Sequence, residues 1–450
     1  MSLKKKPNRP LRLLVIAGSD PMAGAGLQAD LKTASALGVY ALTVVTAVTS
    51  QNTKGVCKIL NVPKEHLSSQ LKSIYDDVEF DGIKIGMIGN KEQAEIIGKF
   101  IEKIKKPVVL DPVLVAQSGG ELSKEVYVKG LFKYCELITP NASEAERLSR
   151  IKIKSLEDMV KAGKSLLSQA KRVLIKGGDT NIGFDVYLEK DKIHTFPIER
   201  INTQNTHGTG CSLATAIASM FLNGYDWYDA VSKSREFIRK SILGGVPLGS
   251  QFGTIDQFAS LKDDARRYFI LNALKEAYEI LNKEDLGGLV PEIQTNLVYA
   301  LPYAEKHQDV AGFPGRIIRY GNKLYAPFPP EFGASKHVAT LVLSARKFYK
   351  EVSSAMALRY IPELIPLLKK EGFSIASFDR NKEPKEIKEK EGSSLDWGVT
   401  EALKNTKNMP DIIYDEGGVG KEPIIRIFGK DPFDVVQKVL KIKKVWNEIC

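Results

Sequence analysis

The sequence lacks the features that mark a secreted or membrane protein. Its four cysteines, Cys57, Cys135, Cys211 and Cys450, show neither the pairing of a metal site nor the dense spacing of a disulfide-rich domain. The apolar run at residues 13–17 is too short for the apolar section of a secretion signal. No stretch approaches the roughly 20 apolar residues that span a bilayer. We therefore expect a cytoplasmic protein that does not contact a membrane.

A nucleic-acid-binding motif is also missing, although the net charge is +11. Lysine and arginine are dispersed along the chain, and no helix-turn-helix module is evident. A need to bind anionic small molecules explains the positive charge equally well. We expect small-molecule substrates and no nucleic acid, and the chain could form a homo-oligomer.

The length of 450 residues exceeds the size at which one hydrophobic core keeps growing, so more than one domain is expected. Up to about residue 253, stretches with helical spacing alternate with short β-branched runs at residues 11–17, 42–48, 82–87, 107–111, 136–139 and 172–176. This alternation predicts an α/β fold with a parallel sheet covered by helices on both faces. The pattern stops near residue 258, which predicts one domain over residues 1–258 and a separate α/β domain over residues 259–450.

Polar residues suited to phosphate chemistry follow several predicted strands, where parallel sheets hold their ligands. Asp111 and Glu144 are hard oxygen ligands, suited to Mg²⁺ directly or through water. Lys176 could place an ammonium group beside the phosphates of ATP, and Asn141 opens the helix that carries Glu144. No Walker A sequence occurs, because the segment 417–421 lacks its spacing and its Ser or Thr.

A glycine-containing turn, Gly208-Thr209-Gly210, precedes a predicted helix at residues 212–222. Unpaired N–H groups at a helix start can stabilise a transferring phosphoryl group, although a connection with Thr209 as a helix cap explains the pattern equally well. Cys211 follows in the first helical turn, where a thiol pKa can fall toward neutrality, so it is a candidate general base. A buried structural cysteine is the alternative.

Two polar residues could recognise a heteroaromatic ring. Asp30 and Gln51 offer an acceptor and an amide, the pair that a ring with an amino group requires, although a solvated aspartate on a helix is an equally simple account of Asp30. A dinucleotide site is disfavoured because no acidic residue ends the second strand.

Seven segments of the first domain resemble hydroxymethylpyrimidine/phosphomethylpyrimidine kinases of the ribokinase-like superfamily. They are GSDPMAGAGLQADLKT, TSQNT, KIGM, LDPV, TPNASEA, KGG and NTHGTGC, in that order. The resemblance implies two successive ATP-dependent phosphorylations of 4-amino-5-hydroxymethyl-2-methylpyrimidine. It also implies that Gln51 binds the pyrimidine, that Asp30, Met87 and Val113 line its pocket, and that Cys211 stands where many such kinases carry a catalytic aspartate. A pyridoxal kinase, from the same superfamily, is the alternative.

The second domain resembles the archaeal-type thiamine-phosphate synthase domain through VAGFPGRI, FGASKHVA and GGVGKEP. The resemblance implies coupling of the pyrimidine diphosphate to thiazole phosphate with release of pyrophosphate. We expect Arg316 to stabilise the departing negative charge and His337 to contact phosphate or donate a proton. A domain that only senses thiamine phosphate is the alternative, and basic residues on solvated loops would account for each segment alone. Strands at residues 315–320 and 424–428 and a helix at residues 338–352 are expected.

Overall fold

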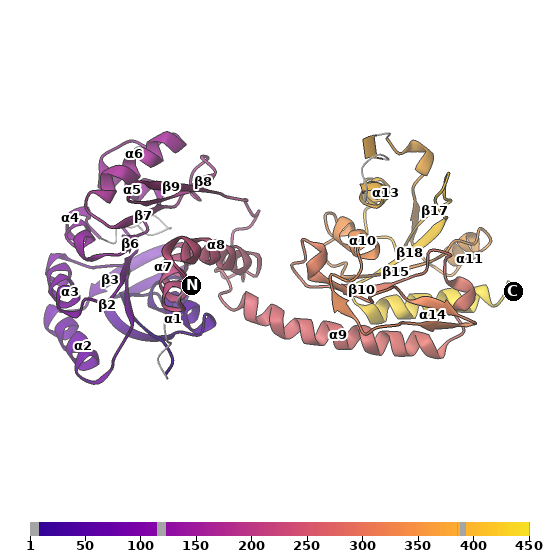
Figure 1. The fold of residues 1–450 in the computed structure, drawn as a ribbon, viewed down its shortest axis with the longest axis horizontal. Helices are drawn as coiled ribbons and strands as arrows, with labels where there is room; N and C mark the ends of the chain where they lie inside the picture. The colour runs from indigo at the N-terminus through magenta and orange to yellow at the C-terminus, as the bar shows by residue number, and fades with distance from the viewer. Residues whose placement is uncertain (1–8, 115–122, 385, 388–392, 450) are drawn as a thin grey trace. The chain divides into compact units, whose positions relative to one another are not determined.

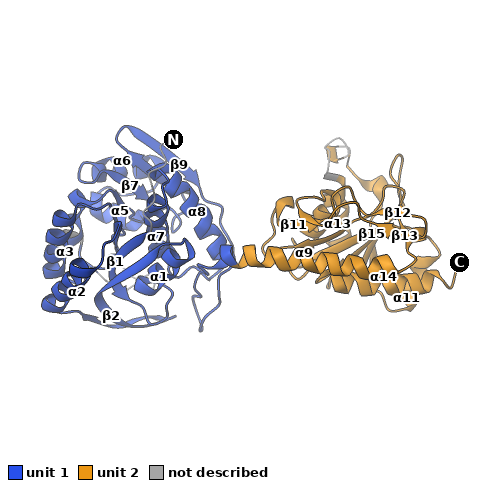
Figure 2. Cartoon of the chain, turned by 60° about the horizontal axis from the view of Figure 1, so that its bottom comes forward, with its two compact units in different colours: residues 1–261 blue, residues 262–450 orange. Residues whose placement is uncertain are grey.

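The computed structural model describes residues 9–114, 123–384, 386–387 and 393–449 (Figure 1), so Cys450 lies outside the described part. The chain divides into two compact units, residues 1–261 and residues 262–450 (Figure 2). The division falls within helix α9 (Ala259–Lys283), which begins one residue after the predicted boundary at 258. Among the described residues, no helix is long and apolar enough to cross a membrane.

A nine-stranded sheet with the order β3-β2-β1-β4-β5-β6-β7-β8-β9 forms the centre of the first unit. All six predicted strands are present as its parallel middle, which confirms the predicted fold class. The edge strands pair antiparallel and were not predicted, because strands such as β3 and β9 expose most side chains and lack continuous apolar runs. The strands are β1 (Arg12–Ser19), β2 (Tyr40–Asn52), β3 (Gly55–Asn61), β4 (Gly82–Ile85), β5 (Val108–Leu110), β6 (Leu137–Ile138), β7 (Arg172–Ile175), β8 (Phe184–Glu189) and β9 (Lys192–Pro197).

Helices cover both faces of this sheet (Figure 1). Side chains alternate along β1, so Leu14 and Ile16 join one core cluster while Leu13 and Val15 join another. The first cluster packs under α2 (Lys64–Asp77), α3 (Lys91–Ile104), α4 (Glu125–Lys129), α5 (Ala142–Ser149) and α6 (Leu156–Leu167); the second packs under α1 (Gly26–Ala36), α7 (Thr209–Leu222) and α8 (Trp227–Leu243).

The second unit has its own seven-stranded mixed sheet, with the order β14-β11-β10-β15-β18-β17-β16. Only the β16–β17 pair is parallel among the pairs of described strands in this sheet. A separate hairpin joins β12 (Ile318–Tyr320) to β13 (Lys323–Tyr325). The strands of the main sheet are β10 (Leu297–Ala300), β11 (Val310–Gly312), β14 (Glu331–Phe332), β15 (Ser354–Arg359), β16 (Ile375–Ser377), β17 (Ile412–Asp415) and β18 (Ile424–Gly429).

Two helical layers enclose the second sheet. Leu297 and Ile425 face a cluster that contains residues of α9, α11 (Leu364–Lys370) and α14 (Pro432–Trp446). Val298 and Phe428 face the opposite cluster, which contains residues of α10 (His337–Ala345) and α13 (Ser393–Leu403). Short 3₁₀ helices lie at Phe132–Tyr134, Gly287–Leu289, His307–Asp309 and Arg380–Lys382.

The elements predicted for the second unit are present but differ in length. The predicted strand at residues 424–428 lies within β18, whereas only the last three residues of the run at 315–320 form a strand. The helix predicted for residues 338–352 ends at Ala345. Its C-cap, Arg346, is buried and donates Nη1 to the carbonyl oxygen of Val352 at 2.8 Å, which favours a turn over a continued helix.

Candidate active sites

The predicted phosphate turn lies at the start of α7. Gly208 is the N-cap with φ of 85°, and a Cβ there would lie 1.7 Å from the carbonyl oxygen of Gly24, so only glycine fits. The helix start leaves the N–H groups of Gly210 and Cys211 without intrahelical acceptors. A Cβ on Gly210 would lie 3.3 Å from Lys176 Nζ and 3.8 Å from Asp111 Oδ2. The fold therefore brings together the turn, the lysine and the aspartate that the sequence placed at separate strand ends.

Asp111 and Lys176 form an ion pair at this turn. Lys176 Nζ lies 2.8 Å from Asp111 Oδ1, which also accepts a hydrogen bond from Thr139 Oγ1 at 3.1 Å. Burial opposes the charge of Lys176, but Asp111 and Glu144 outweigh it and raise the pKa of Lys176. Among the described residues, no hydrogen bond is made to Asp111 Oδ2, so this oxygen is available beside Gly210.

Glu144 and Asn141 form a capping box at the start of α5. Asn141 Oδ1 accepts the N–H of Glu144 at 2.8 Å, while Glu144 Oε2 accepts the N–H of Asn141 at 2.8 Å. Glu144 Oε1 also accepts the N–H of Leu114. Burial, with a contribution from Asp111, raises the pKa of Glu144 to about 7 although Lys176 opposes the shift. Both residues thus shape the site, but both carboxylate oxygens of Glu144 and the Oδ1 of Asn141 are already engaged with the backbone.

The described residues contain no cluster of three acidic, histidine or cysteine side chains that could hold a metal ion alone. Mg²⁺ commonly binds through one or two carboxylates, with phosphate oxygens and water completing its shell. Asp111, with its available Oδ2, fits that pattern better than Glu144.

Cys211 lies in the first turn of α7, but its thiol does not have the low pKa that we expected from that position. Burial, together with Asp30 and Asp111, raises the pKa of Cys211 to about 12, although Lys84 and the N–H of Gly26 act in the opposite direction. Desolvation and two carboxylates therefore outweigh the helix start. The thiol is protonated at neutral pH in the unliganded protein.

Asp30 is fully buried and engaged with protein groups, which does not suit the ring contact that we expected. Its Oδ2 lies 2.7 Å from Lys84 Nζ, and its Oδ1 accepts Thr215 Oγ1 at 2.7 Å. Lys84 is equally buried, in the interior of β4. Thr215 is four residues after Cys211 and on the same face of α7, so the ion pair lies one helical turn from the thiol. Sequence reasoning missed Lys84. The feature that could have revealed it is a charged residue within an otherwise apolar strand.

A pocket that is partly open to solvent lies beside the phosphate turn and includes the predicted Gln51. Gln51 Nε2 lies 3.1 Å from His207 Nε2, which is 3.0 Å from Asp20 Oδ2. Burial opposes ionisation of Asp20, but hydrogen bonds from His207, Ala25 and Met22 hold its pKa below the usual value. The lining residues are Met22, Gly24, Gln51, Asn52, Thr53, His207, Leu248, Phe252 and Thr254.

Met87 and Val113 are not among the residues that line this pocket. Met87 is buried against Gly18, with its sulfur 2.9 Å from where a Cβ on that glycine would lie. Val113 is partly exposed and follows Asp111 directly. His207, which sequence reasoning did not single out, is the ring that connects the pocket to Asp20, and its signal was the NTHGTGC segment itself.

Two of the quoted segments of the second unit contact the same short stretch before β10. Arg316 donates to the carbonyl oxygen of Ile293, and Glu422 accepts the N–H groups of Glu292 and Ile293 at 2.8 and 3.1 Å. The VAGFPGRI and GGVGKEP segments therefore converge on the same short stretch. His337, at the start of α10, is close enough to Arg316 to feel its charge.

His337 is exposed, and its electrostatic environment favours the neutral ring. Partial burial, followed by the charge of Arg316, lowers the pKa of His337 below its usual 6.5. A neutral imidazole does not suit the proton donor that we considered, whereas it suits a phosphate contact that gains charge when an anion binds.

Comparisons with known proteins identify a family for each of the two units. The family model described as phosphomethylpyrimidine kinase matches residues 20–256, and that described as thiamine-phosphate synthase ThiN matches residues 273–441. The bifunctional thiamine biosynthesis protein ThiDN of Methanocaldococcus jannaschii is 35% identical over 445 residues, which cover 97% of this chain and 99% of that protein. A hydroxymethylpyrimidine/phosphomethylpyrimidine kinase of Staphylococcus aureus is 36% identical over 57% of this chain and 96% of its own.

Solved structures extend the comparison to the fold. An ADP complex of Bacillus subtilis pyridoxal kinase aligns with a TM-score of 0.52 and 29% identity, over 56% of this chain and all of that one. Fold and site thus define a kinase unit of the ribokinase-like class, joined to a second α/β unit. The chain belongs to the family of bifunctional thiamine biosynthesis proteins, in which a phosphomethylpyrimidine kinase domain precedes a ThiN-type thiamine-phosphate synthase domain. The predicted family is confirmed.

Proposed function

We propose that the first unit transfers the γ-phosphoryl group of ATP to 4-amino-5-hydroxymethyl-2-methylpyrimidine and then to its monophosphate. The observation that carries the proposal is the meeting of the Gly208–Gly210 turn with Lys176 and Asp111, beside the pocket that contains Gln51. The kinase relatives named above and the ADP complex of a related kinase support it.

Phosphoryl transfer here depends on stabilising negative charge. The migrating group carries charge on its equatorial oxygens and requires positioning more than covalent chemistry. Three hydrogen-bond donors for a phosphoryl group lie together at the start of α7. They are the N–H groups of Gly210 and Cys211 and the ammonium of Lys176. They constitute the anion-stabilising part of the site, and Thr209 orders the turn through a hydrogen bond to the carbonyl oxygen of Thr206.

Mg²⁺ would be held by Asp111 Oδ2, with Glu144 reached through water. The ion would neutralise charge on the ATP phosphates when bound. The pairing of Asp111 Oδ1 with Lys176 keeps Oδ2 oriented toward Gly210. Asn141 contributes by fixing the backbone that holds Glu144.

The pyrimidine is proposed to bind in the pocket with the Gln51 amide and the His207 ring as its polar contacts. Met87 and Val113 remain proposed apolar neighbours. Asp30 takes a different role, because it positions Lys84 and Thr215 below Cys211 and does not reach a ring.

Cys211 is retained as the proposed proton acceptor, a role that only its thiolate can fill. The thiol is protonated at rest, so it must first release its proton to solvent; the thiolate then takes the proton of the attacking hydroxyl as the new O–P bond forms. The nearby cation Lys84 favours the thiolate.

The second unit is proposed to join the pyrimidine diphosphate to thiazole phosphate, with release of pyrophosphate. Arg316 stabilises the departing diphosphate, and His337 contacts its phosphate oxygens. The same chain would then make a substrate and consume it, which gives the fusion a chemical rationale.

Two assays test these proposals with the full chain. Turnover of the pyrimidine alcohol should exceed that of pyridoxal, and a strong preference for pyridoxal would overturn the assignment of the substrate. Incubation with the pyrimidine diphosphate and thiazole phosphate should yield thiamine phosphate and pyrophosphate. Binding of both reactants without product would favour the sensing domain instead.

A further inference from the structure

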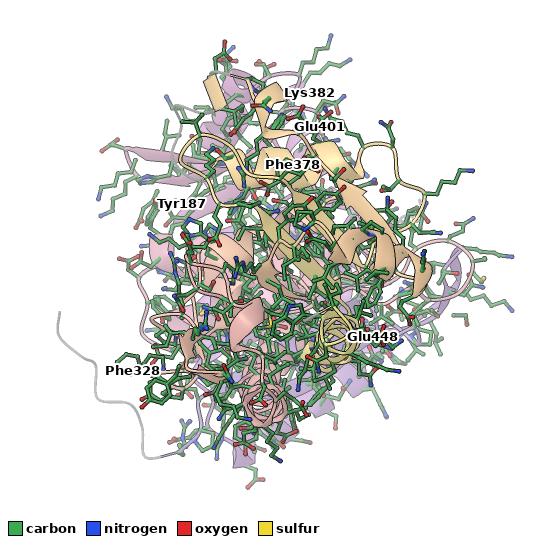
Figure 3. The ribbon with its side chains drawn as sticks, turned by 90° about the vertical axis from the view of Figure 1, so that its right-hand side faces the viewer. Tyr187, Phe328, Phe378, Lys382, Glu401 and Glu448 are labelled. Atoms are coloured by element: carbon green, nitrogen blue, oxygen red, sulfur yellow. The ribbon has the colours of Figure 1, made fainter. Side chains whose placement is uncertain are left out.

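A buried carboxylate in the second unit is shared by two arginines. Asp415, at the end of β17, has no exposed surface; Arg380 Nε lies 2.6 Å from its Oδ1, and Arg426 Nη2 lies 2.7 Å from its Oδ2. Both guanidinium groups lie over the ring of Phe378, at 5.4 and 5.2 Å from its centroid. Phe378 and Lys382, both labelled in Figure 3, follow β16 in the chain. One carboxylate cannot neutralise two guanidinium groups, so positive charge is left over.

A further ion pair does not remove the surplus. Lys421 Nζ lies 3.1 Å from Glu383, whose carboxylate is buried, and 2.9 Å from Ser394 Oγ. Among the residues that the structure describes, three cations therefore face two carboxylates in this cluster, which we name the Asp415 cluster: Arg380, Asp415, Arg426, Lys421 and Glu383. An uncompensated charge with little exposure is costly, and a bound anion would offset that cost.

The Asp415 cluster opens toward solvent at the GGVGKEP turn. Gly417 and Gly420 have φ values of 81° and 71°, and the N–H of Gly417 donates to Asp415 Oδ1 at 2.9 Å. A Cβ on Gly418 would lie 3.7 Å from Arg380, while Val419 at the tip is completely exposed. The N–H groups of Gly417 and Gly418 donate to Asp415 Oδ1 and to the carbonyl oxygen of Lys421. Those of Val419 and Gly420 make no hydrogen bond to a residue that the structure describes, so they are the donors that the turn can offer to a ligand.

An exposed arginine extends the same row of the sheet. Arg359 at the end of β15 pairs with Ile424, which pairs in turn with Asp415, so the three side chains project from one face. Arg359 is exposed, and it makes no ion pair with a residue that the structure describes. It can therefore contribute a free guanidinium group to a ligand that lies over the turn.

We propose that Arg359, Lys421 and the Gly417–Gly420 turn, backed by Arg380 and Arg426, form a second anion site that takes a phosphate or diphosphate group. Its assignment to a substrate rests on the coupling reaction proposed above, in which both reactants carry phosphate. Because Arg316 and His337 are proposed to hold the diphosphate, the Asp415 cluster holds the phosphate of thiazole phosphate.

Anion binding to the full chain tests the site without turnover. Inorganic pyrophosphate and inorganic phosphate are titrated by calorimetry, with ADP and Mg²⁺ saturating the first unit. Because a charge-assisted contact is lost, Arg359→Ala and Lys421→Ala should each weaken one of the two anions about 10-fold. Lys382→Ala, an exposed lysine next to the cluster, is the matched control and should change neither affinity.

The two anions also identify the substrate. Weaker binding of phosphate, with a parallel rise in the KM of thiazole phosphate, is the expected result. Weaker binding of pyrophosphate would mean that the pyrimidine diphosphate lies at this site and would overturn its assignment to Arg316 and His337. Unchanged affinities in both variants would overturn the proposal. The Arg380→Lys variant provides a second test. A lower melting temperature with unchanged anion affinity would also overturn the proposal, because the cluster would then serve folding alone.

The outcome separates this site from the proposed reaction. If the wild-type protein makes no thiamine phosphate but the variants lose anion binding, the anion site stands and the coupling function is refuted. If the wild type couples and the variants keep both KM values unchanged, the coupling function stands and the anion site is refuted.

Discussion

The two units treat buried charge differently. In the first, Lys84 is paired with Asp30 and Lys176 with Asp111, so each cation has a carboxylate before any ligand arrives. In the second, two arginines share Asp415, and exposed Arg316 lies close to His337. The first site is organised by internal ion pairs, whereas the second has a surplus of positive charge that its anionic substrates must balance. Substitutions should therefore affect folding and activity together in the first unit but mainly ligand affinity and rate in the second.

The largest effect is expected from Gly208→Ala. The new methyl group would collide with the carbonyl oxygen of Gly24, and the turn could not keep its φ of 85°. Misplacing N–H donors of an anion-stabilising turn should lower the rate of pyrimidine phosphorylation about 1,000-fold. Gly178→Ala is the matched control, since no atom lies within 4 Å of its Cβ position. A Gly208→Ala protein that retains normal kinase rates would show that the turn does not hold the phosphoryl group.

Arg316→Ala should abolish coupling without affecting the kinase. Loss of the cation that faces the departing diphosphate is expected to lower the coupling rate about 300-fold. Arg319→Ala, an exposed arginine on β12, serves as the control. Equal loss of both activities would indicate misfolding rather than a role in charge stabilisation.

Lys84→Met tests the paired charges of the first unit. The substitution leaves Asp30 buried without its cation, which should cost about 3 kcal/mol of unfolding free energy in denaturant titrations of the full chain. Lys171→Met breaks an exposed pair with Glu136 and should cost less than about 1 kcal/mol. Similar costs for the two variants would contradict the claim that the internal pair organises this site.

Cys211→Ala should lower phosphorylation about 100-fold, with pyrimidine affinity nearly unchanged. Burial raises the pKa of Cys211 to about 12, so little thiolate is present at neutral pH. This small fraction limits the contribution of Cys211 as a base. Steady-state kinetics of Cys211→Ala, compared with Cys57→Ala on exposed β3, provide the measurement. Normal turnover of Cys211→Ala would exclude the thiol as proton acceptor.

The smallest effect concerns His337. Because its folded-state pKa lies below 6.5, this residue supports stability above pH 6.5, and that contribution declines as the pH falls toward the folded-state pKa. In Arg316→Ala, the pKa of His337 should rise toward 6.5, and inorganic pyrophosphate should raise it in the wild type. NMR titration of the imidazole measures both shifts. A pKa that responds to neither change would separate His337 from the anion site.

The middle of the first sheet was predictable because its strands are continuous apolar runs. The carboxyl ends of parallel strands lie at one edge, so the sequence predicted Asp111 and Lys176 at the same ligand-binding edge of the sheet. The partner of Asp30 was not predictable, because the pair depends on how α1 packs onto the sheet that contains β4. The high pKa of Cys211 also escaped prediction, since the carboxylates of Asp30 and Asp111 come from elements distant in sequence.

The second unit was predicted less fully from its residues. Its sheet is built largely from antiparallel pairs, so a candidate site assembles from turns on non-adjacent segments and not from successive strand ends. The closeness of Arg316 and His337 followed only from the resemblance. The sharing of Asp415 by Arg380 and Arg426 requires the register of β17 against β18, which no local pattern specifies.

A crystal structure of the full chain with a non-hydrolysable ATP analogue, Mg²⁺ and the pyrimidine alcohol tests the central claim most directly. Phosphate oxygens should lie about 2.7–3.2 Å from the N–H groups of Gly210 and Cys211, with Lys176 Nζ in contact and the hydroxymethyl group facing the terminal phosphate. A triphosphate bound away from the start of α7, with these donors facing only water, would contradict it.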